Sequence, residues 1–211
     1  MARSLLLASG NAGKLRELRG LVSPLGWDVL TPGDAGLDRV HVVEGDRSYL
    51  ENATAKAVAY LRASGLPSLA DDSGIEVDAL GGDPGVLSAR FGGHRAGSDA
   101  QRCALLLRRL EGVPEPRRGA RFRAVVVLAL PGGATVAREG SVEGRIATAP
   151  RGSTGFGYDP VFELPDGRTM AEAGDEKQRL SHRARALSAM MAVLEALDEP
   201  LHSPDRARGR R

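Results

Sequence analysis

The order of apolar segments along the chain constrains its fold more than any other feature. Hydrophobic spacing predicts strands at residues 4–8, 27–30, 69–70, 75–77, 122–130 and 135–146. It predicts helices at residues 12–21, 50–63, 100–110 and 180–197. Strands and helices alternate early, and strands cluster later. We therefore expect an α/β protein with a central mixed β-sheet flanked by helices.

The charge is unevenly distributed along the chain. The 211 residues carry a formal net charge of +2, which could suggest a nucleic-acid-binding protein. Residues 200–211, however, contain four arginines and one aspartate, a net +3, so the rest of the chain is close to −1. We expect one domain over residues 1–199, a disordered basic tail over 200–211, and no nucleic-acid partner.

Cysteine content and the N-terminal segment bear on the compartment. Cys103 is the single cysteine and lies in an apolar run, so we expect a buried thiol and no intramolecular disulfide. The apolar run at residues 5–8 is too short for a signal peptide or a membrane span. These features predict a cytoplasmic protein with no membrane partner.

The first predicted strand is followed by a turn of small and polar residues: Ser9, Gly10, Asn11, Ala12, Gly13 and Lys14. A P-loop is excluded, because Ala8 stands where it needs glycine and Leu15 where it needs a hydroxyl. What remains is the N-terminus of a helix, where free amides and the helix dipole favour anions such as phosphate. The alternative is that Asn11 only caps the helix and Lys14 is solvated.

Carboxylates form a second group. Residues 71–74 are predicted to form a turn between two short strands. Asp71 and Asp72 follow the first of these strands, and neighbouring side chains of an extended chain point to opposite faces, so we expect one of the two to enter a cleft and the other to anchor the loop. Glu44 and Glu51 are further candidates. Next to a triphosphate, such groups could hold Mg²⁺ or accept a proton from water. The alternative is a surface turn, since Asp, Ser and Gly all favour turns.

A third group combines aromatic and hydrogen-bonding side chains. Phe156 and Tyr158 lie among glycines, where the backbone can approach a ligand and a ring can stack on a base. Ser181 is suited to cap a helix, with His182 and Arg183 behind it as donors toward carbonyl oxygens. The alternative is an aromatic plug over the core beside an ordinary capped helix.

Taken together, these residues resemble one family, the inosine/xanthosine triphosphate pyrophosphatases. The resemblance covers about residues 4–197. It is carried by Ser9-Gly10-Asn11-x-x-Lys14, Glu51-Asn52-Ala53-x-x-Lys56-Ala57, Ala70-Asp71-Asp72-Ser73-Gly74, Pro84-Gly85-x-x-Ser88-Ala89-Arg90, residues 155–160 and Ser181-His182-Arg183. The chain departs from the family's spacing at Gly45 and within residues 172–177.

The resemblance implies an elongated two-lobed fold with an active-site cleft between the lobes, a homodimer, and dependence on Mg²⁺. It makes Asp72 the proton acceptor and a metal ligand, with Glu44 as a second ligand. The implied nucleotide-binding residues are Ser9, Gly10, Asn11, Ala12, Gly13, Lys14, Ser73, Phe156, Gly157, Tyr158, Asp159, Lys177, His182 and Arg183.

The reaction implied is hydrolysis of the inosine, deoxyinosine and xanthosine triphosphates to the monophosphate and pyrophosphate. Donors on Arg183 and His182 would favour the 6-oxygen of these bases over the amino group of adenine. Two alternatives stay open. One is a broader pyrophosphatase that acts on modified pyrimidine nucleotides, and the other is a nucleotide-binding protein without turnover.

Overall fold

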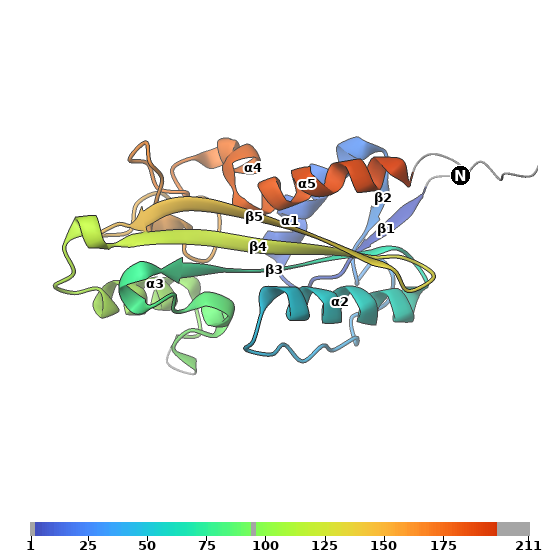
Figure 1. The fold of residues 1–211 in the computed structure, drawn as a ribbon, viewed down its shortest axis with the longest axis horizontal. Coiled ribbons are helices and arrows are strands. Elements are labelled where there is room, and N and C mark those ends of the chain that lie inside the picture. The colour runs from blue at the N-terminus through green and yellow to red at the C-terminus, as the bar shows by residue number, and fades with distance from the viewer. Residues whose placement is uncertain (1–2, 94–95, 198–211) are drawn as a thin grey trace, which may run out of the picture.

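A computed structural model describes residues 3–93 and 96–197 (Figure 1). The strands are β1 (Ser4–Leu7), β2 (Asp28–Leu30), β3 (Ser68–Val77), β4 (Gly119–Ala129), β5 (Thr135–Ile146) and β6 (Phe162–Glu163). The helices are α1 (Ala12–Val22), α2 (Tyr49–Ser64), α3 (Asp99–Arg109), α4 (Lys177–Leu180) and α5 (His182–Ala196). Short 3₁₀ turns are η1 (Ser23–Leu25), η2 (Asp78–Leu80), η3 (Gly85–Arg90), η5 (Glu115–Arg117), η6 (Asp159–Val161) and η7 (Gly174–Glu176).

The strands form one mixed sheet of six in the order β2-β1-β3-β4-β5-β6. The first strand, β1, is parallel to both of its neighbours, whereas the β3–β4, β4–β5 and β5–β6 pairs are antiparallel. The long strands β3, β4 and β5 run along most of the molecule, which is elongated in Figure 1. The predicted α/β class and mixed sheet are confirmed.

Three groups of buried side chains make up the core. Helices α1 and α5 cover one face of the sheet, packing around Leu69 and Val126, and α2 covers the opposite face around Ala70 and Val127. A separate cluster, to which α3 contributes Cys103 and Leu106, contains Ile75 and the aromatic side chains of Phe122, Tyr158 and Phe162. The two ends of the molecule thus have their own cores and share the long strands.

The prediction of a turn at residues 71–74 was wrong. These residues lie in the middle of β3, where Asp71 is opposite Val126 and Asp72 opposite Val125 of β4. Asp, Ser and Gly favour turns when the chain is considered locally, but here the backbone groups are paired with a long neighbouring strand. Gly74 is needed for packing, since a Cβ there would lie 2.2 Å from the carbonyl oxygen of Gly85.

The last predicted helix is present, and a short additional helix precedes it. The helix predicted at residues 180–197 corresponds to α5, which begins at His182, while the separate turn α4 precedes it and Ser181 between them is extended (φ −67°, ψ 154°). The prediction that Ser181 caps a helix is confirmed, because its side chain accepts a hydrogen bond from the backbone N–H of Ala184 (3.1 Å). Cys103 is buried as expected, and burial raises the pKa of its thiol to about 11.

Two further expectations concern the C-terminal tail and association with membranes. The basic tail at residues 200–211 lies outside the described residues. Within residues 3–93 and 96–197, no helix combines the length and apolar character that crossing a bilayer would require.

The contact between α5 and β5 depends on a glycine. A Cβ on Gly140 would lie 2.3 Å from the carbonyl oxygen of His182 and 2.4 Å from the nitrogen of Ala186, both backbone atoms. We expect Gly140→Ala to lower the free energy of unfolding by about 1–3 kcal/mol through overpacking, measured by equilibrium urea denaturation. Gly20→Ala is the control, because its new Cβ has no atom closer than 3.7 Å in the exposed part of α1, and it should be neutral or stabilising by up to about 1 kcal/mol.

Candidate active site

The middle of β3 directs two adjacent carboxylates to opposite faces of the sheet. Asp71 points toward α1 and α5, and Asp72 toward α2; their residues are 1% and 6% exposed. The alternation of an extended strand produces this division, as the sequence predicted. Both carboxylates are almost excluded from water, so each needs charged or hydrogen-bonding partners.

Asp71 is held by a fully buried arginine. The Arg183 Nε donates to Asp71 Oδ2 (3.0 Å), Nη2 donates to Ser73 Oγ (3.0 Å), and Nη1 is paired with Glu17. Burial alone would raise the pKa of Asp71, but the charges of Arg183, Lys14 and Lys56 outweigh burial and hold that pKa well below its usual range. This network joins β3, α1 and the first turn of α5.

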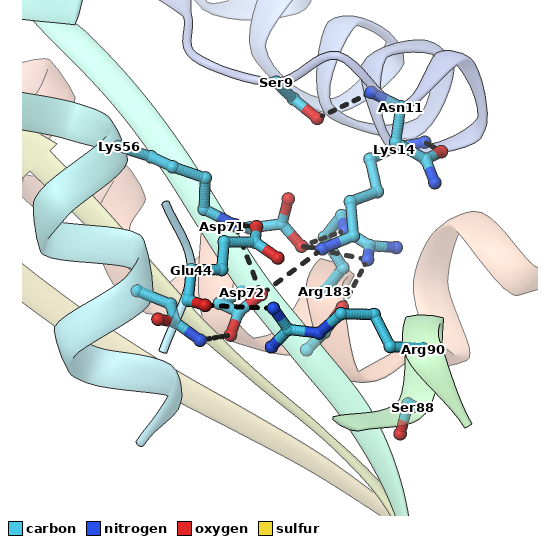
Figure 2. A network of polar contacts seen from close by, with 12 residues as sticks. Ser9, Asn11, Lys14, Glu44, Lys56, Asp71, Asp72, Ser88, Arg90 and Arg183 are labelled. Carbon is cyan, nitrogen blue, oxygen red and sulfur yellow. Dashed lines mark hydrogen bonds and ion pairs between the residues drawn. The ribbon is translucent and has the colours of Figure 1, made fainter. Parts of the chain in front are cut away.

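Lys14 and Lys56 approach Asp71 and Asp72 from different sides (Figure 2). Lys14 Nζ is 3.2 Å from Asp71 Oδ2 and 4.0 Å from Asp72 Oδ1. Lys56 Nζ is 2.9 Å from Glu44 Oε1 and 3.2 Å from Asp72 Oδ1. Burial lowers the pKa of Lys14, whereas for Lys56 the effect of burial is outweighed by Asp72, Asp71 and Glu44, which raise the pKa.

The turn between β1 and α1 brings Lys14 to this position. Asn11 caps α1, its side-chain oxygen accepting from the Lys14 N–H (3.0 Å), and the Asn11 N–H donates to Ser9 Oγ (3.2 Å). Ala12 and Gly13 are the first residues of the helix, and a Cβ on Gly10 would meet no atom within 4 Å. The open space at Gly10 and the free amides of the first helical turn are suited to an anion.

Close to the carboxylates, residues of β3, η3, α3 and α5 line a small pocket of about 100 Å³. Ten of the predicted nucleotide-binding residues line it: Asn11, Lys14, Ser73, Phe156, Gly157, Tyr158, Asp159, Lys177, His182 and Arg183. The others, Ser9, Gly10, Ala12 and Gly13, belong to the turn that precedes Lys14 and to the first residues of α1.

Residues 156–159, called the aromatic loop below, form one wall of this pocket. Lys177 Nζ lies 4.5 Å from the centroid of the Phe156 ring, and Arg183 Cζ lies 5.7 Å from it. A Cβ on Gly13 would come within 2.6 Å of that ring, so the glycine allows α1 to approach it closely. The Phe156 ring therefore has cations beside it and a helix N-terminus packed against it.

The side chains of Tyr158 and Asp159 hold the aromatic loop in position. The Tyr158 hydroxyl donates to the carbonyl oxygen of Ser88 (2.8 Å). Asp159 Oδ2 accepts from the Phe156 N–H (2.8 Å) and from Lys177 Nζ (2.5 Å). Burial raises the pKa of Asp159, although the charge of Lys177 opposes that shift. In this structure Tyr158 and Asp159 position the loop as well as lining the pocket.

His182 is buried and stacked on Phe122, with ring centroids 4.8 Å apart and ring planes 15° apart. Burial and the neighbouring charge of Arg183 lower the pKa of His182 well below its usual value, so the imidazole is neutral near pH 7. Among the described residues its Nδ1 has no hydrogen-bond partner. The Nδ1 atom is buried, so it is a buried polar atom that the surrounding side chains leave unsatisfied.

Four residues of this constellation were not predicted as site residues. Glu17 pairs with both Arg183 and Lys177. Asn52 donates to Asp72 (3.0 Å), Lys56 bridges two carboxylates, and Arg90 anchors the loop that carries Glu44. Helical spacing could have indicated three of them, since Lys14 and Glu17 are three residues apart on α1, and Asn52 and Lys56 four apart on α2.

Residues 5–193 match the Ham1 family. The chain belongs to the Ham1 family. A protein of Thermus thermophilus named dITP/XTP pyrophosphatase is 53% identical over 88% of this chain and 89% of its own length. A protein of the same name from Symbiobacterium thermophilum is 48% identical over 93% of this chain and 98% of its own length.

Solved structures of family members have the same fold. The Ham1 protein of Staphylococcus aureus superposes with a TM-score of 0.80 at 34% identity, covering 92% of this chain and 100% of the other. A nucleoside-triphosphatase/dITP/XTP pyrophosphatase of Mycobacterium abscessus superposes with a TM-score of 0.71 at 45% identity, covering 89% and 98%.

The oxygen atoms around Asp72 fit a hard divalent cation. Glu44 Oε1 and Asp72 Oδ1 both lie within hydrogen-bonding distance of the Lys56 ammonium, so a cation already sits between them. Within the described residues no three His, Cys, Asp or Glu side chains converge as a complete metal site. Mg²⁺ does not need one, because it is usually bound by one or two carboxylates together with water and substrate phosphates.

The Asp71–Arg183 pair makes a testable contribution to stability. Asp71→Asn leaves Arg183 with a weaker partner, so we expect a loss of about 3–5 kcal/mol at pH 7. The native pKa of Asp71 is lowered, so its contribution is present above about pH 4 and is lost as the pH falls toward the native pKa. The difference between wild type and variant should therefore shrink by about 1.4 kcal/mol per pH unit below pH ~4.

Urea denaturation of both proteins between pH 7 and pH 3 measures this difference. Asp38→Asn is the matched control, because Asp38 is exposed. It should change the free energy of unfolding by less than about 0.5 kcal/mol at any of these pH values. A difference between wild type and Asp71→Asn that does not change with pH would contradict the ion-pair account.

Proposed function

We propose that this protein hydrolyses inosine, deoxyinosine and xanthosine triphosphates to the monophosphate and pyrophosphate, and so removes them from the nucleotide pool. The observation that carries the proposal is Asp72, a carboxylate beside Lys56, Glu44 and Lys14, of which Lys14 also lines the neighbouring pocket. The names of its relatives in the Ham1 family support the same reaction.

In this proposal, some polar side chains bind the triphosphate and others bind its metal ion. Lys14, Lys56 and the N-terminus of α1 are placed to bind phosphate oxygens. Glu44 and Asp72 would hold Mg²⁺, which when bound supplies positive charge to the phosphates and acidifies water. In the structure Lys56 pairs with both carboxylates, so it can exchange these partners for phosphate when substrate and metal enter.

In the proposed reaction, Asp72 activates the attacking water. Water attacks the α-phosphorus while Asp72 accepts its proton, and the bond from the α-phosphorus to the bridging oxygen breaks so that pyrophosphate leaves with that oxygen. Asn52 donates to Asp72 Oδ2 (3.0 Å) and Lys56 to Asp72 Oδ1 (3.2 Å), which orient the carboxylate. Each oxygen accepts one hydrogen bond from the protein, and a second lone pair on each remains for metal or water.

The pocket favours a base that accepts hydrogen bonds. Lys177 and Arg183 are donors only, and Phe156 offers a ring for stacking. Adenine would set its amino group against these donors, at a cost of about 1–3 kcal/mol for each buried group left unpaired. Arg183 already donates hydrogen bonds to Asp71, Ser73 and Glu17. To bind the base, it would have to donate to the base while keeping these partners. Its role toward the base stays a prediction.

Three other expectations stay predictions as well: dependence on Mg²⁺, a homodimer, and a cytoplasmic location. Val43, Leu50 and Leu87 are the large apolar side chains exposed in the described part of the chain, at 82%, 45% and 44%. Light scattering coupled to size-exclusion chromatography measures the oligomeric state directly.

Pyrophosphate release from a panel of nucleotides tests the proposed function. With Mg²⁺ we expect inosine, deoxyinosine and xanthosine triphosphates to be cleaved with a kcat/KM at least about 10²-fold above that for ATP, and EDTA to stop the reaction. Preference for modified pyrimidine nucleotides would favour the broader pyrophosphatase. Nucleotide binding without any product would favour a binding protein. Direct release of orthophosphate would contradict cleavage between the α and β phosphates.

Asp72→Asn keeps the shape of the side chain while removing the proton acceptor and one metal ligand. We expect kcat for inosine triphosphate to fall by roughly 10³-fold or more, with a free energy of unfolding close to that of wild type. Asp71→Asn should show the opposite balance, a clear loss of stability and a smaller loss of kcat, since Asp71 is committed to Arg183. Equal losses of kcat in the two variants would contradict this division.

A further inference from the structure

Arg90 makes a two-pronged contact with a loop that is distant in sequence. Its Nη1 donates to the carbonyl oxygen of Glu44 (2.9 Å) and its Nη2 to the carbonyl oxygen of Gly45 (2.8 Å). Figure 2 shows the guanidinium reaching from the end of η3 to the strip of chain that carries Glu44. Arg90 itself is exposed, so the contact is not a by-product of core packing.

The loop has few other means of holding its position. Residues 38–48 form no helix or strand, so no backbone ladder determines where Glu44 points. The second anchor is Asn52, whose Oδ1 accepts from the Gly45 N–H (2.8 Å) and whose Nδ2 donates to the Gly45 carbonyl (3.2 Å). Arg90 from η3 and Asn52 from α2 therefore hold the same peptide from two sides.

The geometry requires arginine in particular. Two successive carbonyl groups accept from the two terminal nitrogens of one planar guanidinium, which fixes both the position and the orientation of the peptide. A lysine would present a single mobile charge and could not fix orientation in this way. The side chain of Glu44, so held, meets Lys56 next to Asp72.

We propose that Arg90 is a positioning residue that places Glu44 for binding Mg²⁺. The inference rests on the proposed function for its metal and adds a residue assigned no role there. It implies that Arg90 acts through Glu44 and not on the base. Residues Ser88 and Ala89, just before Arg90, line the base pocket, so η3 connects the pocket wall to the metal-binding loop.

Metal binding to the nucleotide-free protein is the primary test. Isothermal titration with Mg²⁺, and Mn²⁺ titration followed by electron paramagnetic resonance, should show a dissociation constant about 10-fold higher or more in Arg90→Gln, because loss of an outer partner typically costs 10- to 100-fold in metal affinity. Arg90→Lys should be intermediate. Arg108→Gln is the control, an exposed arginine on α3, and should bind metal like wild type.

Kinetics separate positioning from contact with substrate. In Arg90→Gln the Mg²⁺ concentration for half-maximal rate should rise by the same factor as the dissociation constant. The kcat should return to within about threefold of wild type at saturating Mg²⁺, and the preference for inosine triphosphate over ATP should be unchanged. A kcat that excess Mg²⁺ does not restore would overturn the proposal, as would an altered base preference.

A double-mutant cycle tests whether Arg90 acts through Glu44. Glu44→Gln should weaken metal binding by itself, and adding Arg90→Gln to it should have no further effect, since both act through one carboxylate. Additive losses, or a Glu44→Gln protein that binds metal normally, would overturn the role of Arg90. These tests measure metal affinity and do not depend on product release. If the wild-type protein binds metal but releases no pyrophosphate, the proposed function is refuted, and the comparison of Arg90→Gln with wild type still tests this inference.

Discussion

The buried guanidinium of Arg183 is the group on which the site's architecture depends. It connects the first turn of α5 to Asp71 on β3 and to Glu17 on α1, three elements that belong to different parts of the sequence. Leaving one member of such a pair buried without its partner typically costs about 3–5 kcal/mol. The cost of separating these groups keeps α1, α5 and the sheet in one relative position, and with them Lys14 and the wall of the pocket.

Around that centre the charges alternate, so that each of these buried cations and carboxylates has a partner of opposite sign. Glu17 lies between Arg183 and Lys177, Asp71 between Arg183 and Lys14, and Asp72 near Lys14 and Lys56. The arrangement suits a ligand that brings both signs of charge, a triphosphate with a divalent cation. Lysines can then move from carboxylates to phosphates while the metal takes the carboxylates, so the change in net charge within the site stays small.

Local patterns predicted the elements well where periodicity was strong, and less well where tertiary pairing decided. The helices α1, α2 and α3, and the strands β1, β4 and β5, lie within three residues of their predicted bounds. The segment at Asp71–Asp72 was predicted as a turn from its composition and is the centre of a ten-residue strand. Pairing with β4 holds the backbone there in an extended ladder, and no local signal reports a partner strand so far along the chain.

The sequence by itself determined which chemical groups this protein has: the cap at Asn11, the cations Lys14 and Arg183, the carboxylate pair, and the aromatic loop. The expectation that Asp71 and Asp72 face opposite ways holds only for extended chain, and the pairing of β3 with β4 provides that conformation. Only the tertiary structure decided which of them is committed to Arg183 and which is left beside Lys56 and Glu44. Contacts between residues so distant in sequence depend on how the sheet curls and where the helices pack, and local sequence does not encode these separately.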